Sequence, residues 1–150
     1  MDTFVRAVAT GVFTGYLPWV PATWATLLVG IPFYLAVHGL GPLGYTAVLV
    51  ALTLVSIYTA GRMETSTGQR DPHCVVIDEI VGYLFAMAFL PCSTATIALS
   101  FFLFRGFDIV KPYPVGLADR TVRGGLGITL DDIIAGVMAN ICVRGIHWLF

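Results

Sequence analysis

The sequence predicts an all-α protein, a small integral-membrane helical bundle. Of its 150 residues, 57% are hydrophobic and only 11% are charged, and the mean hydropathy is +0.86. Soluble domains are about 45 to 50% apolar and about 25% charged, so this chain has too few polar residues to cover a water-facing surface. No Asp, Glu, Lys or Arg lies between Arg6 and Arg62, which indicates that the first third of the chain is embedded in lipid.

Four apolar stretches are candidates for the helices of this bundle. A helix that crosses a membrane needs about 20 mainly apolar residues. The stretches 23–37 and 43–60 are separated by the turn signal HGLGP at 38–42, so we expect them to form an antiparallel hairpin. The other two candidates are 80–104 and 133–150. The protein is therefore expected to cross the membrane several times.

The third stretch is expected to turn back at Pro91, as a hairpin of two short helices or as a re-entrant element. Basic residues favour the cytoplasmic side of a membrane, and they flank this stretch on both sides, at Arg62 and Arg70 before it and at Arg105 and Lys111 after it. An even number of crossings keeps these groups on one side. A single long kinked helix would instead place 105–131 outside.

Size and charge limit the remaining possibilities. The chain is short enough for one membrane-embedded domain over residues 1–150. A net charge of −1 and a pI of about 6.2 do not fit nucleic-acid binding, which requires a strongly basic face. The widely spaced Cys74, Cys92 and Cys142 are expected to be free thiols that pack as small apolar groups.

The segment DPHCVVIDEIVG at 71–82 places Asp78 and Glu79 immediately before an apolar helix. A carboxylate at mid-bilayer costs about 2.5 to 3.5 kcal/mol, so such residues need a function, or a position at the membrane edge beside the positive helix N-terminus. Helical neighbours point about 100° apart, and we therefore do not expect both to be equivalent metal ligands. His73 is a weaker site candidate.

The segment RGFDIVKPYPVGLADR at 105–120 places Arg105, Asp108 and Lys111 three residues apart. On a helix this spacing forms one stripe of cation, carboxylate and cation. Such a stripe can bind a phosphate and a metal together. The alternative is a ladder of surface ion pairs.

The segment GGLGITLDDIIAG at 124–136 is a glycine-rich turn that leads into a helix with Asp131 and Asp132. Gly124, Gly125 and Gly127 could let the backbone approach a ligand closely at a helix N-terminus. The alternative is a cap formed by Thr129 and Asp132. Together, the three acidic segments with their Arg and Lys residues predict oxygen ligands for Mg²⁺ and cationic groups for phosphate.

Three of these motifs, in this order and spacing, closely resemble bacterial phosphatidylglycerophosphatase A: VVIDEIVG (75–82), FRGFDIVKPYPVGLADR (104–120) and GGLGITLDDIIAG (124–136). The segment GYLPWVPATWATL (15–27) resembles that family's Pro-Gly-Thr-x-Gly-Ser-Leu segment, with Ala22, Ala25 and Thr26 in place of Gly, Gly and Ser. The resemblance covers nearly the whole chain. It implies a Mg²⁺-dependent phosphatase of the bacterial cytoplasmic (inner) membrane that hydrolyses phosphatidylglycerophosphate to phosphatidylglycerol and phosphate on the cytoplasmic side.

On this basis we expect the phospholipid's acyl chains to lie along the apolar helices and its terminal phosphate to reach the acidic cluster. The expected catalytic and Mg²⁺-ligating residues are Asp78 or Glu79, with Asp108 and with Asp131 or Asp132. The expected phosphate-binding residues are Arg105, Lys111 and Arg120. Water would attack phosphorus, with a carboxylate or the metal site supplying the base, or an aspartyl phosphate would form.

A small ion-coupled transporter or channel subunit is the alternative, with the same carboxylates as a cation path. Its support is the short internal echo between IDEIVG and LDDIIAG, because transporters often contain repeats with broken helices.

Overall fold

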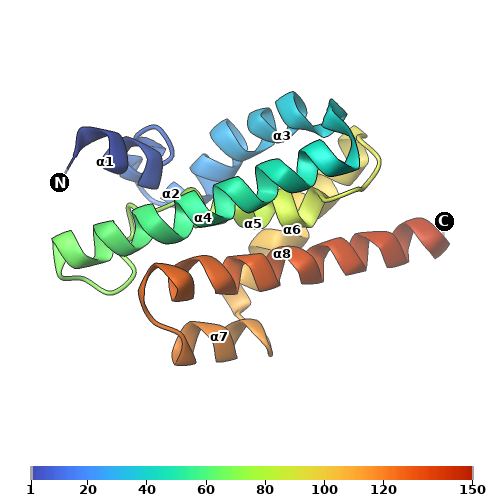
Figure 1. The fold of residues 1–150 in the computed structure, drawn as a ribbon. Helices are drawn as coiled ribbons and strands as arrows, with labels where there is room; N and C mark the ends of the chain where they lie inside the picture. Colours follow the sequence, from blue (N-terminus) through green and yellow to red (C-terminus); the bar gives the residue numbers. More distant parts are fainter. Residues whose placement is uncertain (1, 150) are drawn as a thin grey trace.

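The computed structural model describes residues 2–149, and every regular element in this range is helical (Figure 1). This confirms the all-α class. The α-helices, in order, are α1 (Thr3–Ala9), α2 (Pro21–Ala25), α3 (Ile31–Val37), α4 (Gly41–Thr67), α5 (Ile77–Met87), α6 (Thr94–Val110), α7 (Val115–Thr121) and α8 (Gly124–Leu149). Short turns of helix lie between them at η1 (Thr14–Tyr16), η2 (Thr26–Gly30) and η3 (His38–Leu40).

The first expected hairpin is confirmed. The chain runs through α2, η2 and α3, turns at η3, and returns along α4 in the opposite direction (Figure 1). Two helical stretches, Pro21–Thr67 and Gly124–Leu149, are apolar and long enough to cross a membrane. With 27 residues, α4 alone is about 40 Å long, which exceeds the hydrocarbon core of about 30 Å.

The turn near Pro91 is also confirmed. Helix α5 ends at Met87 and α6 begins at Thr94, where the side chain of Ser93 accepts a hydrogen bond from the Thr96 amide. The returning helix packs along α5, because Tyr83 donates a hydrogen bond to the Ile97 carbonyl at 3.2 Å. With only 11 residues, α5 is about 16 Å long, roughly half the thickness of the hydrocarbon core.

Two polar side chains of α8 satisfy the C-terminal carbonyl groups of α5. Asn140 Nδ2 donates to the carbonyls of Ala86 and Ala88 at 2.9 and 3.0 Å. Arg144 donates to Ala88 at 2.8 Å and to Asn140 Oδ1 at 2.7 Å. Carbonyl groups at a helix end that are buried from water need such partners.

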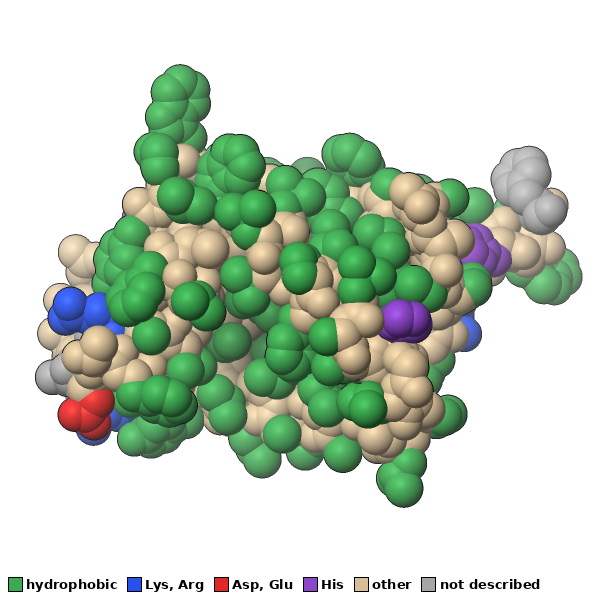
Figure 2. All heavy atoms as spheres, turned by 90° about the horizontal axis from the view of Figure 1, so that it is seen from above, with side chains coloured by type: hydrophobic (Ala, Val, Ile, Leu, Met, Phe, Trp, Pro, Cys, Tyr) green, Lys and Arg blue, Asp and Glu red, His purple; other side chains and the backbone are tan. Residues whose placement is uncertain are grey.

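Helix α5 is the centre of the molecule, surrounded by α4, α6 and α8. Nine of its 11 residues are buried. In contrast, α4 exposes large apolar side chains such as Leu43 and Leu54, as expected for a lipid-facing helix. Figure 2 shows hydrophobic side chains over the middle of the visible face, while most visible charged groups gather at one end.

The three cysteines are free thiols, as expected. Cys74 and Cys142 are partly buried. The expectation that all three pack as apolar groups is wrong for Cys92, which is exposed in the turn between α5 and α6.

Glycines allow α5 and α8 to pack at very short distance. A Cβ atom at Gly82 would lie 2.7 Å from the Asp132 carbonyl oxygen, and one at Gly136 would overlap the Gly82 carbonyl. Small residues in this role are typical of helix pairs in membranes. The two helices run in parallel, since positions 82 and 86 of α5 meet positions 136 and 140 of α8.

The glycines at the start of α8 also serve helix packing. A Cβ at Gly125 would overlap the Ile57 carbonyl of α4, and a Cβ at Gly127 would lie 2.5 Å from the Val122 carbonyl. Gly127 also lines a hollow together with Gly124, so the expectation that these glycines give a ligand access to the backbone stays a prediction. The alternative cap is wrong, because α8 begins at Gly124 and Thr129 lies inside the helix, donating to the Gly125 carbonyl.

Candidate active site

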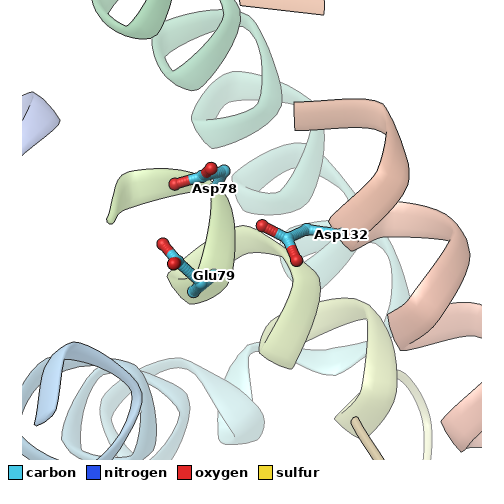
Figure 3. Close-up of side chains that lie close together, drawn as sticks. All are labelled: Asp78, Glu79 and Asp132. Carbon is cyan, nitrogen blue, oxygen red and sulfur yellow. The ribbon is translucent and has the colours of Figure 1, made fainter. Parts of the chain in front are cut away.

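Three carboxylates meet between α5 and α8. Asp78 and Glu79 lie in the first turn of α5, and Asp132 lies on α8. Each offers an oxygen atom, and these oxygens all lie within 4.8 Å of one another. Figure 3 shows the three side chains converging on the same space from the two helices. We refer to Asp78, Glu79 and Asp132 as the acidic cluster.

Helix geometry explains how the cluster forms. Asp78 precedes Gly82 by one helical turn, and Asp132 precedes Gly136 by one turn, so each carboxylate lies on the same face as its glycine. Because the glycines bring these faces together, the carboxylates one turn earlier also meet. The positive end of the α5 dipole favours the two acids in its first turn.

A cavity of about 250 Å³ opens beside the cluster. Six acids, two cations and one histidine from α5, α6, α8 and their connections line it. These are Asp71, Asp78, Glu79, Asp108, Asp131, Asp132, Arg105, Lys111 and His73. The early segment forms another wall through Trp19, Val20, Pro21 and Ala22. The cavity therefore combines segments that are far apart in the sequence.

The two cations of the cavity are held by acids outside the cluster. Arg105 Nη1 lies 2.6 Å from Asp108 Oδ2, as the three-residue spacing predicted. Lys111 Nζ donates to Asp119 Oδ1 at 2.8 Å and to Asp131 Oδ2 at 2.7 Å. Partial burial lowers the pKa of Lys111, but these two carboxylates outweigh burial and raise that pKa above its ordinary value. Lys111 therefore stays positively charged.

The structure brings together most of the residues that the sequence singled out. Asp108 and Asp131 line the cavity but lie outside the acidic cluster, and Arg105 and Lys111 line it as well. Arg120 does not line it: its side chain is exposed and borders a separate hollow beside α7. This placement does not support the expectation that Arg120 binds the same phosphate as Arg105.

The two acidic pairs behave differently. Asp131 and Asp132 point to different partners, as helical neighbours should, since Asp131 contacts Lys111 and Asp132 joins the cluster. Asp78 and Glu79 both contribute an oxygen to the cluster. Both side chains therefore reach the same space beside the N-terminal end of α5, and the expectation that they are not equivalent metal ligands stays a prediction.

Sequence analysis did not assign a site role to Asp71 or to the segment around Trp19. Asp71 has a left-handed backbone with φ of 47°, in the connection between α4 and α5. Trp19 also has a positive φ, of 79°, and its side chain is 95% exposed at the cavity wall. Of the three replaced family positions, only Ala22 lines the cavity, whereas Ala25 and Thr26 are fully buried.

The acidic cluster fits a divalent cation. The atoms Asp78 Oδ1, Glu79 Oε2 and Asp132 Oδ1 are buried and have no hydrogen-bond partner within residues 2–149. Over the same residues, no Lys or Arg forms an ion pair with any of the three. Buried carboxylates of like charge require a compensating cation, and carboxylate oxygens are the ligands that Mg²⁺ prefers.

We expect Gly136→Ala to reduce catalytic turnover about 100-fold. The added methyl group overlaps the Gly82 carbonyl, so α5 and α8 must move apart by on the order of 1 Å. A displacement of this size at a reacting centre can cost about 10² in rate. The measurement is the catalytic rate per folded protein in detergent, alongside the midpoint of thermal unfolding.

Gly145→Ala on the same helix is the matched control, because its methyl group meets no atom within 4 Å. It should keep wild-type turnover. If Gly136→Ala is folded and equally active, close contact of α5 and α8 does not set the geometry of the site.

Comparisons with known proteins give one consistent family. The family model described as phosphatidylglycerophosphatase A matches residues 7–147. A protein named phosphatidylglycerophosphatase A from Escherichia coli (strain K12) is 33% identical, and the match covers 94% of this chain and 83% of that protein. A protein of the same name from Haemophilus influenzae is 31% identical, and the match covers 97% of this chain and 90% of that protein. A Bacteroides thetaiotaomicron protein named "Putative phosphatidylinositol-3-phosphatase" is 35% identical over 95% and 92%. No solved structure matches. The names of these relatives favour a phosphatase over the transporter alternative.

Proposed function

The chain belongs to the phosphatidylglycerophosphatase A family, and from this premise we propose that it is a Mg²⁺-dependent enzyme that hydrolyses the terminal phosphomonoester of phosphatidylglycerophosphate. The products are phosphatidylglycerol and inorganic phosphate. The observation that carries this proposal is the acidic cluster beside Arg105 and Lys111, in one cavity at the end of an apolar bundle. Such a site can hold a metal and a phosphate next to a lipid-facing surface.

Asp78, Glu79 and Asp132 would hold Mg²⁺, because their unpartnered oxygens converge. When bound, Mg²⁺ polarises a phosphoryl oxygen and neutralises charge that develops in the transition state. Phosphate binding and proton transfer would be carried out by side chains of the protein.

Arg105 and Lys111 would bind the phosphate oxygens. Both line the cavity, and Arg105 Nε is buried without a hydrogen-bond partner in the described part of the chain. The ion pair with Asp108 holds the Arg105 guanidinium in place. Cations that are fixed before the substrate binds stabilise the developing negative charge without reorganisation.

Asp108 is our candidate for the general base. It lines the cavity outside the acidic cluster, and one carboxylate oxygen faces Arg105, which leaves the other to accept a proton from water. The oxygen of that water forms the new bond to phosphorus as the bond from phosphorus to the glycerol oxygen breaks. The proton then passes to the departing glycerol oxygen, so the carboxylate acts first as base and then as acid.

We propose that the site lies on the cytoplasmic side of a bacterial inner membrane. Arg105 and Lys111 line the cavity, and Arg70 and Arg123 border a neighbouring hollow that shares Asp71 and Asp131 with it. Connections rich in Arg and Lys favour the cytoplasmic side. The substrate's acyl chains would lie against the exposed apolar side chains of the helices.

The test is an assay of the purified protein in mixed micelles with phosphatidylglycerophosphate and Mg²⁺. We expect release of inorganic phosphate with phosphatidylglycerol as the lipid product, identified by mass spectrometry. Formation of phosphatidic acid would mean that the diester is cleaved instead, and a lack of any phosphate release would contradict the proposal. Glu79→Gln, purified in the same way, controls for contaminating phosphatases, because it removes a charge of the acidic cluster. The same assay with a membrane-impermeant short-chain substrate in sealed inverted vesicles tests the proposed side.

A further inference from the structure

A second hollow, of about 230 Å³, lies next to the cavity. It is lined by Lys111, Tyr113, Gly116, Leu117 and Arg120, from the end of α6 and from α7, which packs against α8 (Figure 1). Lys111 lines both the hollow and the cavity. The two spaces therefore adjoin at this side chain.

The two spaces differ in charge. Carboxylates dominate the cavity, whereas the lining of the hollow contains two cations and no acid. Arg120 is exposed, and within residues 2–149 its guanidinium has no hydrogen-bond or ion-pair partner. Lys111 has three N–H donors, of which Asp119 and Asp131 take two. The hollow thus offers an anion the free donors of Arg120 and the positive charge of both side chains.

Local backbone structure holds these groups in place. Helix α6 ends at Val110, and Lys111 takes a left-handed conformation with φ of 47°. A Cβ atom at Gly116 would lie 2.6 Å from the Lys111 carbonyl oxygen, so glycine lets α7 approach the Lys111 backbone. Arg120 follows Gly116 by four residues, on the same face of α7.

The apolar rim of the hollow matches an interfacial ligand. Tyr113 is 80% exposed and Leu117 is 49% exposed. A tyrosine ring with an apolar body and a polar tip suits the membrane interface. A ligand whose anionic group is held here would therefore place its apolar groups against the rim and extend its other end toward the cavity.

We propose that this hollow binds the internal phosphodiester of the lipid substrate through Arg120, while the terminal phosphomonoester lies in the cavity against Arg105 and Lys111. This inference rests on the proposed function. It makes Arg120 a specificity-determining residue for lipids with both phosphates, rather than a group that acts on the reacting phosphorus. A cation that forms a charge-assisted bond to the diester should contribute about tenfold or more to affinity.

Two inhibitors test the two sites separately. Phosphatidylglycerol retains the diester and lacks the monoester, whereas inorganic phosphate resembles only the monoester. In Arg120→Gln we expect the competitive inhibition constant of phosphatidylglycerol to rise about tenfold or more, with inhibition by inorganic phosphate the same as in wild type. The KM for phosphatidylglycerophosphate should rise by a similar factor, so that kcat/KM falls mainly through KM and kcat changes little.

Arg123→Gln is the matched control, because Arg123 is also exposed, lies three residues away and does not line the hollow. It should keep the wild-type constants. Diacylglycerol at the same mole fraction corrects for surface dilution. Equal weakening of both inhibitors, unchanged inhibition in Arg120→Gln, non-competitive behaviour, or no inhibition of wild type by phosphatidylglycerol would each overturn the proposal. Failure of wild type to release phosphate at all would instead contradict the proposed function.

Discussion

Asp132→Asn is expected to lower turnover about 10³-fold or more. Asp132 is the α8 member of the acidic cluster, and Asn keeps its size while removing the charge. A loss of 10³ corresponds to about 4 kcal/mol of transition-state stabilisation, which is in the range that a metal supplies. The measurement is the rate of phosphate release at saturating Mg²⁺, together with the Mg²⁺ concentration that gives half-maximal activity, which should rise.

Asp131→Asn is the matched comparison, because it changes the neighbouring residue of the same helix. Asp131 contacts Lys111 and not the acidic cluster, so its loss should cost about tenfold through a less firmly held lysine. The Mg²⁺ dependence should stay as in wild type. If Asp131→Asn loses much more turnover than Asp132→Asn, the metal site must instead lie closer to Lys111.

Removal of divalent metal is expected to reduce phosphate release about 10³-fold or more, and added Mg²⁺ should restore it. Within residues 2–149, the three oxygens of the cluster have no other partner. Without a cation the three acids can only repel one another or take up protons. The measurement is activity after dialysis against EDTA and after readdition of Mg²⁺.

A second readout separates metal binding from catalysis. Mg²⁺ should raise the thermal unfolding midpoint of the wild-type protein, since a ligand that binds only the folded state stabilises it. In Asp132→Asn this shift should be absent or much smaller. Full activity in excess EDTA after exhaustive dialysis would exclude a metal requirement.

The helical class and the turn near Pro91 could be predicted from the sequence, because composition and the placement of basic residues depend on the membrane itself. The ion pair of Arg105 and Asp108 followed from helical spacing. Lys111 does not continue that stripe, because α6 ends at Val110 and the lysine turns to Asp119 and Asp131. Local spacing predicts contacts only as far as the helix extends.

The acidic cluster depended on a contact between α5 and α8 that no local pattern specifies. One signal was present: both acidic segments contain a carboxylate one turn before a glycine, Asp78 with Gly82 and Asp132 with Gly136. Sequence analysis related the two segments only as an internal echo. Their glycines allow the two helices to pack at very short distance, which places the carboxylates one turn earlier opposite each other.

The hydrogen bonds at the end of α5 have a consequence for the order of events during synthesis. The carbonyls of Ala86 and Ala88 receive their donors from Asn140 and Arg144, which a ribosome adds more than fifty residues later. Until then, α5 ends in carbonyl groups that lipid cannot satisfy. The helix that carries Asp78 therefore gains these donors only after α8 has been made, and α8 also supplies Asp132, the member of the acidic cluster that is synthesised after the other two.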